Sequence, residues 1–161
     1  MCRHLLYVAV FLSCSFLSHY ESIAQTVRIN EVMSSNAAVL MDEDGDYPDW
    51  IELYNAGTTS LILEDYGLSD DPEEPFRWIF PDVSIDPGQH LLVFASGKNR
   101  KPVTGNLHTD FSLSAQGEHL MLVNPNGMMV DSLFCPAIQT DISYGRLGSE
   151  PAAWRFFLPS S

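Results

Sequence analysis

Four aspartates stand close together in one short acidic stretch, which is the part of the sequence best suited to bind a ligand. Asp42, Asp44, Asp46 and Asp49 all lie between residues 42 and 49. Their carboxylates are hard oxygen ligands of the kind that Ca²⁺ prefers. The stretch differs from an EF-hand loop because Gly45 stands between Asp44 and Asp46 and no glutamate occupies the twelfth position. We therefore expect either a solvated acidic turn or a calcium site formed by these four aspartates.

The other residue types that could support catalysis are scattered along the chain. His90, His108 and His119 fall on different predicted strands, and Cys135 lies in an apolar segment that favours a buried thiol. His108 has Asp110 nearby and could act as a base, but any polar strand edge offers such a pair. The sequence contains no nucleophile elbow, no His-Glu-x-x-His and no phosphate-binding loop. We predict a protein without catalytic residues and, calcium apart, without a cofactor.

Two further charged features have structural explanations. Glu31 and Glu52 stand among strand residues that should be half buried, and a buried carboxylate needs a hydrogen bond or a counter-charge. We expect neighbouring polar groups such as Arg28 and Asn30 to supply these contacts. The basic run Lys98–Lys101 is expected to be a solvated loop tip.

The N-terminus has the pattern of a secretory signal. A basic start is followed by the mostly apolar run Leu5–Leu17 and by small residues at Ser22 and Ala24. We predict a signal peptide over residues 1–24 and a secreted or cell-envelope (periplasmic) location. A retained membrane anchor and lipid attachment at Cys14 are the alternatives. The remaining residues contain one cysteine, Cys135, so an intrachain disulfide is not expected.

The charge of the chain restricts its partners. The formal net charge is −13 at pH 7, and such a surface repels nucleic acid phosphates and anionic lipids. We expect no nucleic acid partner and no membrane association after signal cleavage. A protein or a cell-surface polymer such as a glycan is the expected partner.

The rest of the chain predicts one all-β domain over residues 25–148, with residues 149–161 as a C-terminal tail or truncated linker. It is centred on Asp49–Asn55, whose bulky side chains pack well on a pleated sheet. The other expected strands are 27–33 with a bulge near residues 30–31, 60–63, 76–81, 83–85, 90–95, 107–113, 119–123, 128–133 and, at the edge, 142–146. Residues 64–75 are expected to be an acidic, turn-rich stretch. Asn126-Gly127 between two apolar runs indicates a hairpin, and the many short strands favour a sandwich or barrel.

Several of these segments together resemble the lamin tail domain, an immunoglobulin-like β-sandwich of nuclear lamins and of many secreted bacterial proteins. The resemblance rests on Asp49–Asn55, Tyr66–Asp70, Trp78–Pro81 with Ile85–Gln89, and Asn124–Gly127. It extends from about Ile29 to Arg146 and implies an immunoglobulin-like sandwich over most of the chain. The predicted signal peptide fits the secreted bacterial branch.

The resemblance also carries an expectation about function, because the family supplies no catalytic residues. It implies a non-catalytic extracellular module, for binding or structure, that mediates protein or surface-polymer interactions. Bacterial members are often attached to secreted enzymes. The alternative is therefore an accessory domain of, or a fragment from, a secreted metal-dependent hydrolase or nuclease.

Overall fold

The computed structural model describes residues 27–148 and 153–158, and every regular element in these ranges is a β-strand. The strands are β1 (Val27–Met33), β2 (Asp49–Asn55), β3 (Leu61–Ile62), β4 (Gly67–Ser69), β5 (Trp78–Ile79), β6 (Ser84–Ile85), β7 (His90–Ala95), β8 (Leu107–His108), β9 (Glu118–Val123), β10 (Met129–Cys135), β11 (Ser143–Leu147) and β12 (Ala153–Phe157). The predicted signal peptide, residues 1–24, lies outside the described residues. Within them, no helix is long and apolar enough to span a bilayer.

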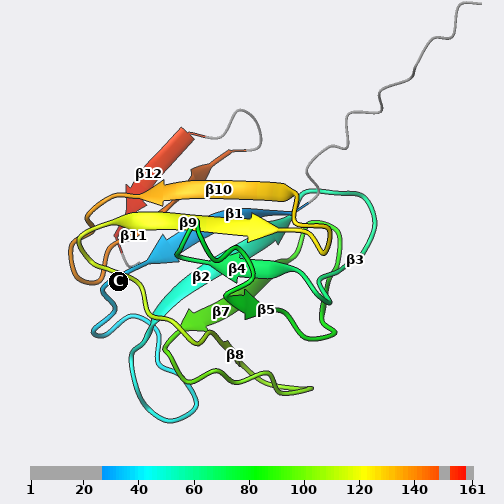
Figure 1. The fold of residues 1–161 in the computed structure, drawn as a ribbon. Coiled ribbons are helices and arrows are strands. Elements are labelled where there is room, and N and C mark those ends of the chain that lie inside the picture. The colour runs from blue at the N-terminus through cyan, green and yellow to red at the C-terminus, as the bar shows by residue number, and fades with distance from the viewer. Residues whose placement is uncertain (1–26, 149–152, 159–161) are drawn as a thin grey trace, which may run out of the picture.

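The strands form two main sheets that pack face to face. The larger sheet has the order β12-β11-β1-β2-β7-β8 and the smaller one the order β10-β9-β4-β5, while β3 pairs with β6. Figure 1 shows β9 and β10 lying in front of β1 and β2. All described pairs of strands are antiparallel except β7 and β8. The predicted all-β sandwich is confirmed.

Alternate side chains of the two sheets build the core between them. Ile51 and Leu53 of β2, Leu120 and Leu122 of β9, and Trp78 of β5 are buried in one cluster. Burying one such side chain contributes about 1.5–3 kcal/mol. Strand β2 pairs with β1 on one side and β7 on the other, so the segment on which the sequence prediction was centred lies in the interior of the larger sheet.

A second, smaller apolar cluster lies on the opposite face of β2. Trp50 packs there with Met33 of β1 and Phe94 of β7, and Leu40 from the β1–β2 loop is packed against them. The loop thus covers one end of the outer face of the larger sheet. This arrangement places the acidic stretch at residues 42–49 beside the ends of β7 and β8.

The structure differs from the sequence prediction between residues 64 and 81. The acidic stretch contains β4, whose three residues are buried, and the predicted strand over residues 76–81 is reduced to β5. Phe76 is exposed instead of facing the core with Trp78 and Phe80. Strand β4 pairs with β5 and β9, and a Cβ at Gly67 would lie 2.5 Å from the carbonyl oxygen of Pro75. Only glycine can occupy that position without a shift of the backbone.

The C-terminal segment also differs from its prediction. Ala153–Phe157 form β12, which pairs with β11 and becomes the edge of the larger sheet. The predicted edge strand at residues 142–146 is therefore an interior strand, and the described part of the predicted tail belongs to the fold. Trp154 stacks on Tyr144 with ring centroids 5.0 Å apart, and the guanidinium of Arg146 lies 4.6 Å from the Trp154 ring centroid.

The predicted bulge in β1 is confirmed, and it leaves backbone groups of β1 that need other hydrogen-bond partners. The register with β2 shifts between Ile29 and Glu31, and β11 pairs with β1 only from Glu31 onward. The Ile29 N–H donates to Asp131 Oδ2 of β10 at 2.8 Å, and Arg146 Nε donates to the Ile29 carbonyl oxygen at 2.9 Å. Arg146 and Asp131 also form an ion pair at 2.9 Å. Two side chains thus take the place of a missing strand partner and join the two sheets.

Removing the Asp131 carboxylate should destabilise the sandwich. Asp131→Ala is expected to lower the free energy of unfolding by about 1.5–3 kcal/mol, the usual value for hydrogen bonds to charged groups. Asp131→Asn should cost less, because an amide oxygen can still accept from the Ile29 N–H. Urea unfolding measures both, with the exposed Glu64→Ala expected within about 0.5 kcal/mol of wild type. An unchanged midpoint for Asp131→Ala would contradict the bridging role.

Candidate functional site

The acidic stretch folds into a tight turn around Asp42. Its Oδ1 accepts the backbone N–H groups of Asp44 at 2.9 Å and Asp46 at 3.0 Å, and its own N–H donates to the Asp46 carbonyl oxygen at 2.8 Å. Gly45 has a φ of 86°, a conformation that suits glycine in such a turn. The turn points three carboxylates in one direction, and their oxygens lie within 4.8 Å of one another.

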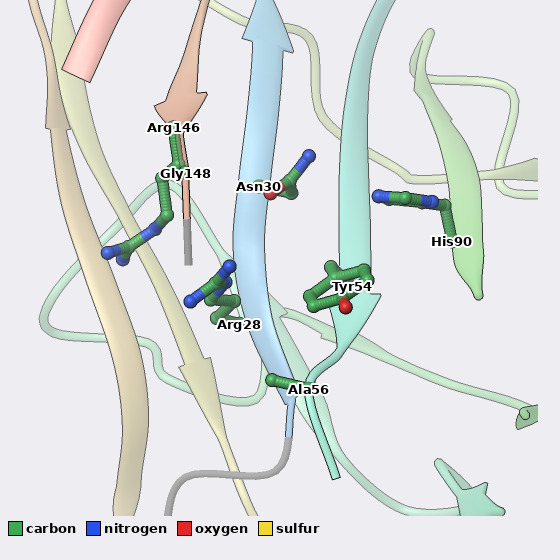
Figure 2. Close-up of a pocket in the computed structure, with 7 residues that line it drawn as sticks. All are labelled: Arg28, Asn30, Tyr54, Ala56, His90, Arg146 and Gly148. Atoms are coloured by element: carbon green, nitrogen blue, oxygen red, sulfur yellow. The ribbon is translucent and has the colours of Figure 1, made fainter. Parts of the chain in front are cut away.

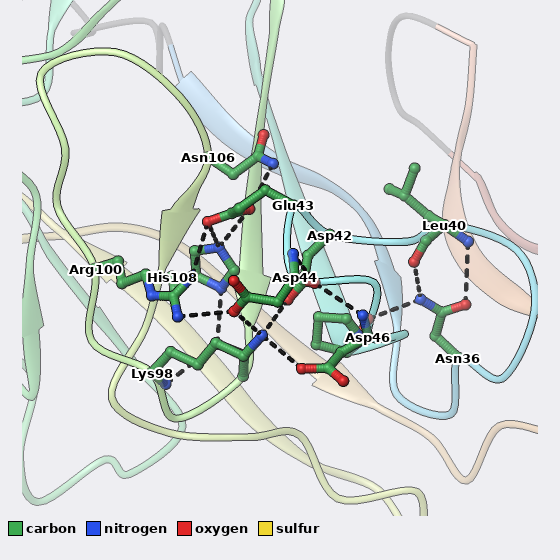
Figure 3. Close-up of polar contacts among 12 residues, drawn as sticks. Asn36, Leu40, Asp42, Glu43, Asp44, Asp46, Lys98, Arg100, Asn106 and His108 are labelled. Carbon is green, nitrogen blue, oxygen red and sulfur yellow. Dashed lines mark hydrogen bonds and ion pairs between the residues drawn. The ribbon is translucent and has the colours of Figure 1, made fainter.

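The ammonium group of Lys98 occupies the place between these three carboxylates. Its Nζ lies 2.5 Å from Asp42 Oδ2, 2.7 Å from Asp44 Oδ2 and 2.8 Å from Asp46 Oδ2 (Figure 3). The Asp42 side chain is fully buried. Lys98 therefore supplies the positive charge that calcium would have supplied under one of the two alternatives drawn from the sequence.

A second set of contacts continues the network around Glu43. Arg100 donates to Glu43 at 3.1 Å and pairs with Asp44 at 2.7 Å, and Asn106 donates to Glu43 Oε2 at 2.9 Å. The buried His108 ring lies between Glu43, 3.1 Å from Nε2, and Ser96, 2.9 Å from Nδ1 (Figure 3). We call residues 42–46 with Lys98, Arg100, Asn106 and His108 the loop clasp. It fastens the β1–β2 loop to the β7–β8 loop.

The clasp favours the charged forms of its members. Hydrogen bonds from Asn106 and from the backbone lower the pKa of Glu43 to about 2, and those from Arg100 and Lys98 lower the pKa of Asp44 to about 2. Burial acts to raise the pKa of Asp42, but the Lys98 hydrogen bond and two backbone N–H groups lower it overall. Burial acts to lower the pKa of Lys98, and the three aspartates raise it well above its usual value.

The structure thus brings together three of the four predicted calcium ligands. Asp49 does not join them: its Oδ1 accepts the Asn36 N–H at 3.2 Å, and burial raises its pKa. The expectation of a solvated tip for Lys98–Lys101 was wrong for Lys98 and Arg100, which face the acidic turn. A basic run in a chain of net charge −13 was the available signal, because the excess carboxylates attract such a run.

The histidines and the cysteine that were considered for catalysis are held apart. His108 is in the clasp, the His90 ring lies against Tyr54 on the larger sheet, and His119 contacts Phe134 on the smaller one. Cys135 is buried, and burial raises the pKa of its thiol to about 11. A thiol with that pKa carries little thiolate at neutral pH.

Sequence reasoning missed a polar pocket across β11, β1, β2 and β7. It has a volume of about 460 Å³ and is lined by Arg28, Asn30, Tyr54, Ala56, His90, Arg146 and Gly148 (Figure 2). We call it the arginine pocket. The Tyr54 and His90 rings have centroids 4.7 Å apart, and the Arg28 guanidinium lies 5.0 Å from the Tyr54 ring centroid. Because these residues come from four strands, only the sheet order reveals that they share one pocket.

Comparison with known protein families identifies the fold. Residues 21–135 match the Lamin Tail Domain, which is more than half of the chain. The chain belongs to the lamin tail domain family. Lamin tail domains are non-catalytic modules of immunoglobulin-like fold, so the predicted fold class is confirmed. No curated protein sequence matches the chain.

Acid should weaken the clasp of this lamin tail domain within a defined pH range. The Glu43 and Asp44 carboxyls have folded-state pKa values lowered to about 2, below the unfolded values of about 4. Their stabilisation is therefore complete above about pH 4 and disappears as the pH falls through about 2. The melting temperature of Arg100→Met should lie below that of wild type at pH 6, and this gap should close by pH 2. Arg155→Met, which removes an exposed charge on β12, is the control, and a gap for Arg100→Met that is independent of pH would contradict the assignment.

Calcium binding at Asp42, Asp44 and Asp46 remains a prediction for this lamin tail domain. A calcium ion would have to displace the Lys98 ammonium, so Lys98→Met should respond to calcium more strongly than wild type. Extracellular calcium sites bind at about 10⁻⁴–10⁻³ M, so melting is measured in millimolar calcium and then with chelator. Adding Asp44→Asn to Lys98→Met should reduce the calcium response. If each protein melts at the same temperature with calcium and with chelator, the acidic turn binds no calcium.

Proposed function

We propose that this lamin tail domain is a non-catalytic extracellular binding module that recognises a surface polymer of the glycan class. The proposal rests on one observation: the groups that could support catalysis are held in ion pairs and hydrogen bonds or are buried. The acidic turn is paired with Lys98, His108 is buried between Ser96 and Glu43, and the Cys135 thiol is buried. The arginine pocket, in contrast, presents polar groups on the surface of a stable sheet.

The composition of the arginine pocket suits hydroxyl and carboxylate groups. Guanidinium groups donate several hydrogen bonds in a fixed geometry, and the Asn30 amide, which already donates to Glu52 at 2.8 Å, adds a carbonyl acceptor. The aromatic pair formed by Tyr54 and His90 offers a face on which the apolar side of a sugar ring can pack. The volume of about 460 Å³ lies within the usual range for small-ligand sites.

The surface charge supports the choice of partner. A net charge of −13 disfavours nucleic acid and anionic membranes. A glycan with few charges meets no such repulsion at the arginine pocket. The predicted secretion would bring the domain to cell-surface polymers of this kind.

The arginine pocket can be tested with purified protein on an array of neutral glycans that includes cello-oligosaccharides. Tyr54→Ala should weaken binding of the retained glycan roughly tenfold, since losing one stacking or hydrogen-bonding contact costs about 1–1.5 kcal/mol. Titration calorimetry measures the dissociation constants.

Phe134→Ala is the matched control, because Phe134 is an exposed aromatic residue on the other sheet. It should leave the dissociation constant unchanged. Equal weakening by both variants would place the ligand elsewhere, and capture of a protein without any retained glycan would favour a protein partner. Metal-dependent turnover on glycan, nucleic acid or phosphoester panels would contradict the non-catalytic assignment.

A further inference from the structure

A second pocket lies at the opposite end of the outer face of the larger sheet. It has a volume of about 510 Å³ and extends from the ends of β1 and β12 to the β1–β2 loop. Glu31, Ser143 and Asp141 contribute polar groups, while Val39, Trp50 and Phe157 contribute walls. We call it the carboxylate pocket. None of the residues that line it is a lysine or an arginine.

In each of its two carboxylates, only one oxygen accepts a hydrogen bond from the described residues. Glu31 Oε1 accepts from the Ser143 hydroxyl, and Asp141 Oδ1 accepts the N–H groups of Ala37 at 2.7 Å and Ala38 at 3.0 Å. The second oxygen of each carboxylate has no hydrogen-bond partner among the described residues. Neither carboxylate takes part in a salt bridge within those residues.

Other acidic groups of the chain contrast with this pair. Asp131 is matched with Arg146, Asp70 with Arg77, and the acidic turn with Lys98. Two carboxylates in one pocket without a cation repel each other, and an incoming positive charge would relieve that repulsion. The carboxylate pocket is therefore complementary to a cationic group.

The indole of Trp50 provides an independent indication of a ligand. The residue is 8 % exposed, and its buried Nε1–H has no hydrogen-bond partner in the described structure. A buried donor without an acceptor is costly and calls for an explanation such as a bound water or ligand. Trp50 also lines the carboxylate pocket, so this unsatisfied donor belongs to the wall at which a ligand would bind.

We propose that the carboxylate pocket binds a lysine or arginine side chain of a partner protein. The cationic head contacts Glu31 and Asp141, and the aliphatic stem packs against Val39 and Phe157. The net charge of −13 draws basic partners toward the domain and raises their association rate.

The test uses two small probes with similar aliphatic side chains, one with and one without a terminal ammonium group. N-acetyl-lysine-N-methylamide is titrated into ¹⁵N-labelled protein while the indole N–H resonance of Trp50, assigned with Trp50→Phe, is followed by NMR. N-acetyl-norleucine-N-methylamide lacks the charge. We expect a saturable shift of the Trp50 resonance with the lysine probe and binding roughly tenfold weaker with the norleucine probe.

Variants locate the charge that the probe recognises. Glu31→Gln keeps an oxygen for Ser143, and Asp141→Asn keeps one for the loop amides and tolerates the φ of 60° at that position. The double variant should bind the lysine probe roughly tenfold more weakly. Glu64→Gln with Glu73→Gln changes the net charge equally at exposed sites and should not alter binding.

Three outcomes would overturn the proposal: no shift of Trp50 with the lysine probe, equal binding of both probes, or equal weakening by the control pair. The comparison of the two probes uses wild-type protein, so it decides the matter even where a variant fails to fold.

Discussion

Strand β1 loses its β11 partner on the N-terminal side of the bulge at Asn30, yet its backbone stays inside the sandwich. A buried peptide group must find hydrogen bonds, because water cannot reach it. Asp131 and Arg146 provide them at Ile29 from two different strands. The same pair joins the smaller sheet to the larger one, and it holds the Arg146 guanidinium that lines the arginine pocket. Fold closure and pocket construction therefore depend on one ion pair.

The excess of acidic residues is the second constraint on the molecule. With only 8 lysines and arginines against 21 aspartates and glutamates, the basic side chains cannot neutralise every acid. The structure concentrates them where carboxylates crowd, as Lys98 does for three aspartates. Carboxylates left without a cation then become the sites at which a positive partner gains most.

Local patterns predicted most of the fold. The bulky strand-forming residues of β2, the hairpin at Asn126-Gly127 and the bulge near Asn30 depend on residues close in sequence, and all three elements are present. Strand β4 escaped prediction because it is only three residues long and lies within an acidic, turn-rich stretch that shows no hydrophobic pattern. Strand β12 was not predicted because it forms by covering β11, and this contact leaves no pattern in the sequence.

The candidate sites were predicted less well than the fold, and the reason is separation along the chain. The turn of Asp42, Asp44 and Asp46 is local and was found, whereas its partner Lys98 stands more than fifty residues away. The arginine pocket combines residues from four strands, from Arg28 to Arg146. Which of these side chains meet is decided by strand order and register, and these become visible only in three dimensions.

The two pockets give the outer face of the larger sheet a basic region and an acidic region, which the net charge of the whole chain does not reveal. Arg28 and Glu31 belong to the same strand, and at about 3.3 Å per residue a basic and an acidic pocket lie a short distance apart. The field of the whole protein is negative and acts over about a Debye length, roughly 10 Å in 0.1 M salt. It therefore hinders anions on their approach to the arginine pocket and helps cations toward the carboxylate pocket. Raising the salt concentration weakens both long-range effects while the hydrogen bonds inside each pocket persist. This field matches the two proposals: a basic partner would be drawn toward the carboxylate pocket, and a weakly charged glycan would be held at the arginine pocket by local contacts.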